Sequence, residues 1–140
     1  IKLYPTKNDD INNGLKSLEN YLSKSNPEVA YLGIGRDGHT AGIFKAKKTT
    51  KYCYLLKNRI DPYYRVTISM NVLTKIPHLI FFVLGSEKKS FIENILNNKK
   101  SKKFEAARFL LINGSGEKTI LCDKKAVPND IGVGELTISL

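Results

Sequence analysis

The feature that most restricts how this chain can fold is a short apolar run followed by a loop with four closely spaced glycines. It occupies Val29–Phe44 and reads V-A-Y-L-G-I-G-R-D-G-H-T-A-G-I-F. The apolar run is typical of a buried strand, and the glycines permit sharp turns and close approach of backbone N–H groups to a bound group. Asp37, His39 and Thr40 lie among the glycines. A charged side chain, an imidazole and a hydroxyl at the exit of a strand predict a chemical site on an α/β scaffold.

Two interpretations of this loop compete on local grounds. The spacing Gly33-x-Gly35-x-x-Gly38 matches the dinucleotide-binding fingerprint, which also requires a full crossover helix and an acidic residue ending the next strand. Here a short lysine-rich segment leads directly to the next apolar run, and Asp61 precedes a proline in a turn-like context. The nucleotide fingerprint is therefore a poor fit. A glycine turn with an incidental histidine remains the alternative that the loop alone leaves open.

The loop also resembles a family signature. G-I-G-R-D-G-H-T-A-G-I-F is similar to the G-x-G-x-D-G-H-T-A-S-L-F motif of the 6-phosphogluconolactonase family, which is related to the glucosamine-6-phosphate deaminases. Further similar blocks follow in order, R-V-T-I-S at 65–69 and F-V-L-G-S-E-K at 82–88, with weaker ones at 106–108 and 121–126. The resemblance implies an α/β fold with a Rossmann-like open, mainly parallel sheet flanked by helices. We expect a lactonase-like domain over 1–126 and a tail or linker over 127–140.

The resemblance implies hydrolysis of 6-phospho-D-glucono-1,5-lactone to 6-phosphogluconate. An imidazole can take a proton from water and return it to the leaving alkoxide, so His39 is the expected general base. Asp37 would orient the imidazole or stabilise its charged form. Backbone N–H groups around Gly38 and Thr40 are the expected oxyanion donors. No metal or other cofactor is expected, because one histidine and one aspartate fall short of a ligand set.

Lys88 and Arg65 are the expected substrate-phosphate ligands. Lys88 falls in the first turn of an expected helix, where a cation is disfavoured unless an anion lies between it and the open N–H groups. A phosphate would satisfy both, and the family places a phosphate-contacting lysine at this G-x-x-K position. From local sequence alone Lys88 could equally be an exposed lysine. For Arg65, packing against a neighbouring tyrosine and pairing with a carboxylate is the stronger interpretation.

Other functions remain open at this stage. The deaminases of the family carry a glutamate five residues after the signature histidine, and this chain has Phe44 there, which favours the lactonase. A noncatalytic sugar-phosphate-binding relative is a further alternative. The family's glycine–serine phosphate loop and its acidic–arginine block do not occur in these 140 residues. We therefore expect either the C-terminal portion of a longer domain, weakly active or inactive alone, or a divergent relative that has lost activity. The partner expected, by fusion or by association, is a glucose-6-phosphate dehydrogenase.

Composition bounds the remaining possibilities. The 140 residues suit one domain, and no apolar run approaches the roughly 20 residues of a membrane helix. The net charge of +10 attracts anions, but dispersed lysines rather than clustered arginines argue against a nucleic-acid-binding module. Cys53 and Cys122 lack metal-ligand spacing and suit reduced thiols. These features, without a basic-then-apolar leader, predict a cytoplasmic protein.

The periodicity of apolar residues predicts the elements around the loop. An amphipathic helix is expected over 6–24, capped by Asn8 or Asp9. Other expectations are a helical turn over 40–48, strands over 52–56 and 66–70, a turn over 59–64, and a strand over 79–84 buried on both faces. A helix should begin at Ser86 or Glu87, and strands are expected at 110–113 and 119–122. His78 is expected at the surface or a strand edge.

Overall fold

The computed structural model describes residues 11–57, 64–97, 104–129 and 136–137. Its elements in chain order are α1 (Ile11–Lys24), β1 (Val29–Gly33), β2 (Cys53–Lys57), β3 (Tyr64–Ile68), α2 (Met70–Leu73), β4 (His78–Val83), the 3-10 turn η1 (Ser86–Lys88), α3 (Lys89–Leu96), α4 (Glu105–Asn113), β5 (Glu117–Cys122) and β6 (Leu136–Thr137). The expected helix caps at Asn8 or Asp9 and the turn around Asp61 lie outside these ranges.

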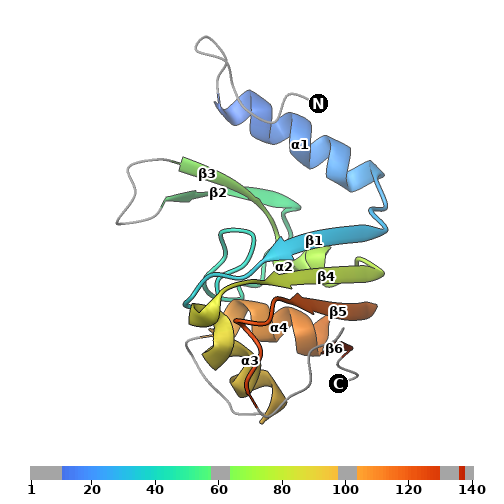
Figure 1. The fold of residues 1–140 in the computed structure, drawn as a ribbon. Coiled ribbons are helices and arrows are strands. Elements are labelled where there is room, and N and C mark those ends of the chain that lie inside the picture. Colours follow the sequence, from blue (N-terminus) through green and yellow to red (C-terminus); the bar gives the residue numbers. More distant parts are fainter. Residues whose placement is uncertain (1–10, 58–63, 98–103, 130–135, 138–140) are drawn as a thin grey trace.

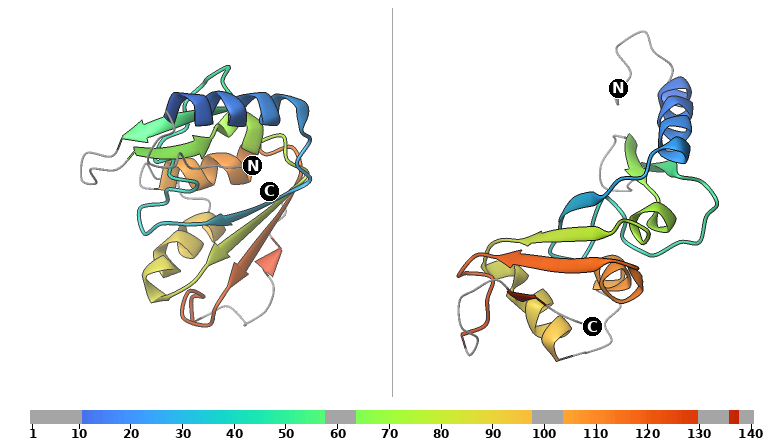
Figure 2. Two further views of the ribbon diagram at one scale, coloured as in Figure 1. Left: turned by 90° about the horizontal axis from the view of Figure 1, so that it is seen from above. Right: turned by 90° about the vertical axis from the view of Figure 1, so that its right-hand side faces the viewer.

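The main sheet is open and largely parallel. Its strand order is β1-β4-β5-β6, with β1, β4 and β5 parallel and β6 antiparallel to β5. A separate antiparallel hairpin, β2–β3, lies with α1 beyond β1, on the side away from β4 and β5 (Figure 1). The view from the side shows the same succession from α1 through the sheet to α3 (Figure 2). The predicted α/β class with a mainly parallel sheet and flanking helices is confirmed.

The two faces of the sheet differ in burial. Leu32, Phe81 and Ile120 lie in register on one face and are almost completely buried. On the other face, Tyr31 of β1 and Phe82 of β4 are 68% and 37% exposed. The prediction that the β4 run is buried on both faces was therefore wrong for the described chain, because the packed helices cover only one face.

The buried face carries the principal core. It combines the inward residues of β1, β4 and β5 with the apolar stripes of α2, α3 and α4, including Leu73, Phe91, Ile92 and Leu110. Fully burying one such side chain contributes about 1.5–3 kcal/mol relative to exposure. Residues 110–113 belong to α4 rather than to the predicted strand, because Ala106, Ala107, Leu110 and Leu111 recur at helical spacing and are all buried.

A smaller cluster joins α1 to the hairpin. Leu18 and Leu22 of α1 are buried against Cys53 of β2. The carboxylate of Glu19 accepts hydrogen bonds from the backbone N–H of Tyr52, at 2.9 and 3.0 Å, and of Cys53, at 2.8 Å. This polar clamp links two segments more than thirty residues apart in the chain. The amphipathic helix was predicted from sequence, whereas the clamp was not.

The segment that follows β1 differs from expectation. The predicted helical turn over 40–48 is instead a tight reversal, because Ala41 and Gly42 have φ values of 50° and 74° and Thr40 pairs with Ile43 in an antiparallel bridge. Part of the 127–140 segment belongs to the sheet, since Leu136 and Thr137 form β6.

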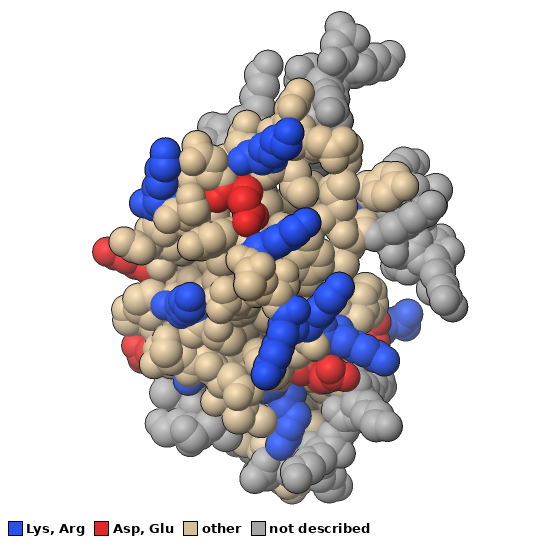
Figure 3. All heavy atoms as spheres, turned by 180° about the vertical axis from the view of Figure 1, so that it is seen from behind, with Lys and Arg blue, Asp and Glu red and all other residues tan. Residues whose placement is uncertain are grey.

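The charged residues do not form one uniform basic surface. Lys and Arg side chains are spread over the face seen in Figure 3, interrupted by acidic side chains and by wide uncharged areas. No helix in the part of the chain that the structure describes is long and apolar enough to cross a membrane.

Candidate active site at the carboxyl ends of the strands

The candidate site lies where the parallel strands end. The glycine loop follows β1, the η1 turn follows β4, and Asp123 follows β5. The Asp123 carboxylate accepts hydrogen bonds from the N–H of Gly85, at 3.0 Å, and from the N–H of Ala126, at 2.9 Å. It thereby fixes the exit of β4 next to the exit of β5. Ligands of open α/β sheets bind in this region.

Two glycines of the loop are required by its geometry. A Cβ on Gly35 would overlap the His39 ring and approach Asp37 Oδ1 to 2.8 Å. Gly38 has a φ of 80°, and a Cβ there would overlap the backbone of Phe104. The Gly38 carbonyl also accepts a hydrogen bond from the Ala107 N–H of α4, at 3.2 Å. The loop therefore folds back tightly and is anchored on α4.

His39 and Asp37 form a hydrogen-bonded pair at the surface. The distance from His39 Nδ1 to Asp37 Oδ1 is 2.6 Å, and the two side chains are 38% and 51% exposed. The same carboxylate oxygen accepts the His39 backbone N–H at 3.2 Å. Burial disfavours ionisation of Asp37, but the hydrogen bonds from the His39 side chain and backbone outweigh it and lower the pKa of this carboxyl. A neutral imidazole that donates from Nδ1 keeps Nε2 as a proton acceptor.

The pair opens into a shallow pocket of about 500 Å³ lined by Arg36, Asp37, His39 and Glu87. Glu87, in the turn after β4, lines the same pocket as His39. Its Oε1 lies 3.7 Å from Nζ of Lys88, a side chain only 12% exposed. Lys88 is the N-cap residue of α3. The Glu87 carboxylate thus lines the pocket of the His–Asp pair and also lies beside the Lys88 ammonium.

Other predicted site residues are arranged differently. The N–H of Gly38 donates to the Gly35 carbonyl at 2.9 Å, and the N–H of Thr40 donates to the Ile43 carbonyl at 3.1 Å. The Thr40 side chain is fully buried and donates to the Gly33 carbonyl at 2.9 Å. In this conformation both amides are engaged by carbonyls of the same loop. Arg65 lies exposed in β3, outside the group of residues that line the pocket.

Three contributions to the site were missed from sequence. Glu87 was considered only as the start of a helix, although an acidic residue directly before the candidate phosphate lysine is a usable signal. The role of Asp123 in fixing the turn after β4 had no local signal, because Gly85, whose N–H the carboxylate accepts there, belongs to a distant segment. The ring of Phe44 lies 4.8 Å from the His39 ring, centroid to centroid. Within the described ranges, no three His, Cys, Asp or Glu side chains gather as a metal site would require.

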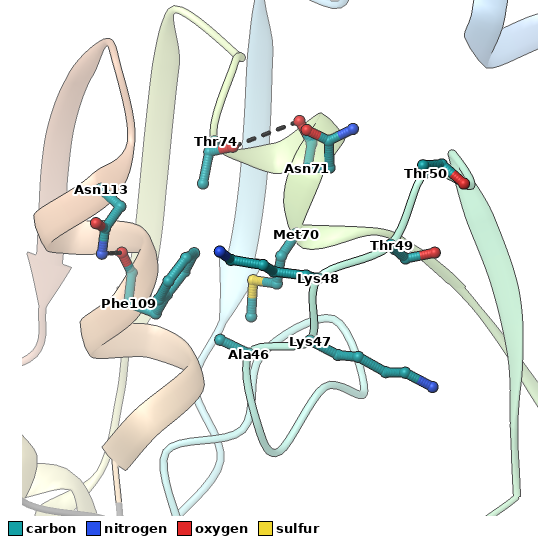
Figure 4. Close-up of a pocket in the computed structure, with 10 residues that line it drawn as sticks. All are labelled: Ala46, Lys47, Lys48, Thr49, Thr50, Met70, Asn71, Thr74, Phe109 and Asn113. Carbon is teal, nitrogen blue, oxygen red and sulfur yellow. Dashed lines mark hydrogen bonds between the residues drawn. The ribbon is translucent and has the colours of Figure 1, made fainter.

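A larger hollow of about 930 Å³ lies elsewhere, between the lysine-rich segment after the loop, α2 and α4. Lys48 extends toward Phe109 of α4, whereas Lys47 points away from it (Figure 4). The hollow contains none of the predicted site residues. His78 also lies outside the group of residues that line the candidate site. It is exposed at the start of β4, as expected, with Nδ1 3.2 Å from Glu117 Oε2.

The fold and the site define an α/β protein with a histidine–aspartate pair at the carboxyl edge of a parallel sheet. Comparison of the sequence with protein families gives a match over residues 2–120 to the family described as glucosamine-6-phosphate isomerases/6-phosphogluconolactonase. The chain belongs to this family. The resemblance inferred from the loop signature is thereby confirmed.

Individual relatives support the same assignment. The chain is 31% identical over 115 residues to a 6-phosphogluconolactonase of Helicobacter pylori, a match that covers 79% of this chain and 50% of that protein. It is 34% identical over 85 residues to a probable 6-phosphogluconolactonase of Dictyostelium discoideum, covering 55% of this chain and 35% of that protein. The chain spans about half the length, or less, of these curated relatives.

Solved structures share the fold. The crystal structure of 6-phosphogluconolactonase from Leishmania guyanensis superimposes with a TM-score of 0.70 at 20% identity, over 86% of this chain and 53% of that one. A monomeric glucosamine-6-phosphate deaminase superimposes with a TM-score of 0.63 at 20% identity, over 86% of this chain and 55% of that one. Both branches of the family therefore have the architecture seen here, across about half of their length.

Proposed function

We propose that this chain supplies the acid–base portion of a site that hydrolyses 6-phospho-D-glucono-1,5-lactone to 6-phosphogluconate. The observation that carries the proposal is the 2.6 Å contact between His39 Nδ1 and Asp37 Oδ1 beside an open pocket. Relatives named 6-phosphogluconolactonase support the substrate class. The absence of a glutamate at position 44 supports hydrolysis over the isomerase–deaminase reaction.

In the proposed reaction, His39 acts through Nε2. That nitrogen removes a proton from water as the water oxygen attacks the lactone carbonyl carbon. The resulting tetrahedral oxyanion collapses, the bond to the ring oxygen breaks, and the imidazolium returns the proton to that oxygen. Asp37 holds the tautomer that keeps Nε2 basic and stabilises the imidazolium while it exists. Because the Gly38 and Thr40 amides are engaged, an oxyanion donor must come from another group or from a rearranged loop.

Lys88 is the proposed ligand of the substrate phosphate. Its side chain is mostly buried, and its ammonium lies 3.7 Å from a carboxylate oxygen of Glu87. An incoming phosphate would compete with Glu87 for this ammonium. Binding energy gained at the phosphate would fix the carbonyl against His39. Arg65 is a secondary candidate, because it lies outside the pocket lining.

The decisive test is lactone hydrolysis by the longest native polypeptide that carries these 140 residues. Replacing His39→Ala should lower kcat about 100- to 10,000-fold, the usual contribution of a general base. Asp37→Asn should give a smaller fall, because the base remains but its orientation is lost. An unchanged rate in His39→Ala would exclude the mechanism. Binding of 6-phosphogluconate without turnover by the unaltered protein would instead indicate a noncatalytic sugar-phosphate-binding relative.

The phosphate role has a matched control on the neighbouring residue. Lys88→Gln should raise KM about 10- to 100-fold, because a hydrogen bond between charged groups contributes about 1.5–3 kcal/mol. Lys89→Gln should leave KM nearly unchanged, since Lys89 Nζ instead contacts Asn129 Oδ1 at 3.0 Å. With an unphosphorylated gluconolactone, Lys88→Gln should have little effect. Equal effects on both substrates would assign Lys88 a structural role.

A further inference from the structure

Arg36 lies in the turn that carries the His–Asp pair. The N–H of Gly38 donates to the carbonyl of Gly35 at 2.9 Å, which closes a β-turn. Arg36 and Asp37 are the two central residues of this turn. The N–H of Gly35 donates to the carbonyl of His39 at 2.8 Å and closes the same loop a second time. The backbone that carries the guanidinium is therefore held at a fixed place relative to the imidazole.

Arg36 also lines the pocket of this pair, as an exposed side chain. Of the four described residues in the lining, it is the one with a permanent positive charge. Both carboxylates of the lining already have a partner, since Asp37 Oδ1 lies 2.6 Å from His39 Nδ1 and Glu87 Oε1 lies 3.7 Å from Lys88 Nζ. Within the described ranges, no carboxylate lies close enough to Arg36 for an ion pair. The guanidinium is thus open to an anion that enters the pocket.

Hydrolysis of a lactone creates negative charge at one atom. When the water oxygen attacks the carbonyl carbon, an electron pair of the C=O bond moves to the carbonyl oxygen, and stabilising that oxygen lowers the barrier. In this conformation the N–H groups of Gly38 and Thr40 already donate to carbonyls of the same loop. A donor that lines the pocket and carries its own positive charge meets the need without any rearrangement of the backbone.

The same position becomes a carboxylate in the product. The tetrahedral oxyanion and the product carboxylate both present charged oxygens to the pocket, whereas the lactone carbonyl carries no charge. A guanidinium offers several N–H donors in a planar fork, and its hydrogen bonds strengthen when the acceptor is ionised. Arg36 should therefore bind the transition state more tightly than the lactone. Binding of this kind accelerates a reaction, whereas equal binding of both states does not.

We propose that Arg36 is a further catalytic residue, whose guanidinium donates hydrogen bonds to the lactone carbonyl oxygen as it becomes an oxyanion, and then to the product carboxylate. The inference rests on the proposed lactone hydrolysis. The water oxygen bonds to the carbonyl carbon, His39 Nε2 takes the water proton, and Arg36 keeps all of its own protons. The oxyanion then re-forms the C=O bond as the bond to the ring oxygen breaks, and the ring oxygen takes the proton from the imidazolium. The carboxylic acid so formed ionises to the carboxylate.

The first test measures lactone hydrolysis by the longest native polypeptide that carries these 140 residues. Arg36→Ala should lower kcat about 10- to 100-fold and change KM less than about threefold, because the contact strengthens only as charge develops. The fall should be smaller than the roughly 100- to 1000-fold known for enclosed oxyanion donors, because this guanidinium is exposed to water. Position 36 does not have a left-handed backbone conformation, so alanine fits there.

Two further substitutions separate catalysis from a general loss of charge, which matters in a chain with a net charge of +10. Lys47→Ala removes one positive charge from an exposed side chain that lines a different hollow and points away from it (Figure 4). This variant should leave kcat unchanged. Arg36→Lys keeps the charge but loses the planar fork, so its kcat should lie between those of the unaltered protein and Arg36→Ala. Circular dichroism establishes that each variant is folded.

The second test requires no turnover. Binding of 6-phosphogluconate is compared with binding of D-glucitol 6-phosphate, which has the phosphate but no carboxylate, by isothermal titration calorimetry. Arg36→Ala should weaken 6-phosphogluconate about tenfold, as expected for a lost hydrogen bond between charged groups, and D-glucitol 6-phosphate less than about twofold. Lys88→Gln should weaken both ligands, because both carry the phosphate.

The outcomes distinguish this inference from the proposed function. Equal kcat values for Arg36→Ala and Lys47→Ala would overturn the role of Arg36 and leave His39 in place as the base. Equal weakening of the two ligands by Arg36→Ala would also overturn it, because the carboxylate would then have no contact with the guanidinium. A fall in kcat with Arg36→Ala but not with His39→Ala would uphold Arg36 and count against the proposed general base.

Discussion

The main sheet and the α1–hairpin layer are held together by different forces. Beneath the sheet, large apolar side chains such as Phe81, Leu79 and Phe91 are packed with almost no exposure. Among the described residues of the α1–hairpin layer, the buried apolar cluster consists of Leu18, Leu22 and Cys53, and the Glu19 carboxylate joins the two segments through backbone N–H groups. The first region depends on buried area, whereas the second depends strongly on one charged hydrogen-bond acceptor.

This difference bears on the candidate site. The His39 loop is anchored on the main core through α4, and it also touches the hairpin, where the Thr67 hydroxyl donates to the Ala41 carbonyl. A substitution that destabilises the sheet core should therefore unfold the site. A substitution that removes the hydrogen bonds of Glu19 should loosen only the side of the site that touches the hairpin. Four measurements separate these outcomes, in order of decreasing effect.

The largest effect is expected from Phe81→Ala. The side chain is completely buried at the centre of β4, and its loss leaves a cavity that the surrounding core cannot close. The free energy of unfolding should fall by about 3–5 kcal/mol in urea denaturation. Phe82→Ala makes the same chemical change on the neighbouring, exposed position and should cost well under half as much. Equal losses would mean that the open face is covered in solution.

A smaller effect is expected from Glu19→Gln. The amide keeps the shape but loses the negative charge that accepts two backbone N–H groups, so we expect a loss of about 1–2 kcal/mol. Amide exchange at Tyr52 and Cys53 should accelerate while exchange in β4 stays unchanged. Glu28→Gln, at an exposed position, is the control. Acceleration throughout the sheet would show that the two regions unfold as one unit.

The same clamp predicts a dependence on pH. Burial raises the pKa of Glu19, but hydrogen bonds from Tyr52 and Cys53 and the nearby charge of Lys51 outweigh it, so the net shift is downward. A lowered pKa means that the folded state favours the carboxylate. The stabilisation is present above the ordinary value of 4.5 and is lost as the pH falls below it. In Glu19→Gln this acid-dependent opening of the α1–hairpin layer should be reduced.

The smallest perturbation is chemical labelling of the two thiols. Burial, followed by the neighbouring Glu19 carboxylate, raises the pKa of Cys53 to about 12, and the side chain is 1% exposed. Cys122 is half-buried, and burial raises its pKa as well. At pH 8 iodoacetamide should modify Cys122 first, because the thiolate is the reactive species and access to Cys53 is closed. Glu19→Gln should accelerate labelling of Cys53 specifically. Equal initial rates at the two thiols would contradict the closed packing of α1 on β2.

Local sequence patterns predicted several elements correctly. The apolar stripe of α1, the strand before the glycine loop and the stripe of α3 each follow from residue spacing within one segment. The pattern failed where packing decided between states. Residues 110–113 are apolar enough for a strand but continue the buried stripe of α4, and residues 40–43 reverse sharply instead of starting a helix.

The sequence by itself determined the family, the parallel α/β class and the adjacency of His39 and Asp37, because these depend on motif order and on short-range spacing. Only the tertiary structure decided that Glu87 joins their pocket, that Asp123 fixes the turn after β4, and that loop carbonyls occupy the Gly38 and Thr40 amides. Tertiary structure also left one sheet face open. The Glu87 and Asp123 contacts join segments far apart in the chain, and a local pattern carries no information about which distant backbone group will satisfy a given side chain. The loop amides are engaged locally, by a sharp reversal at Ala41 and Gly42 that the pattern did not predict.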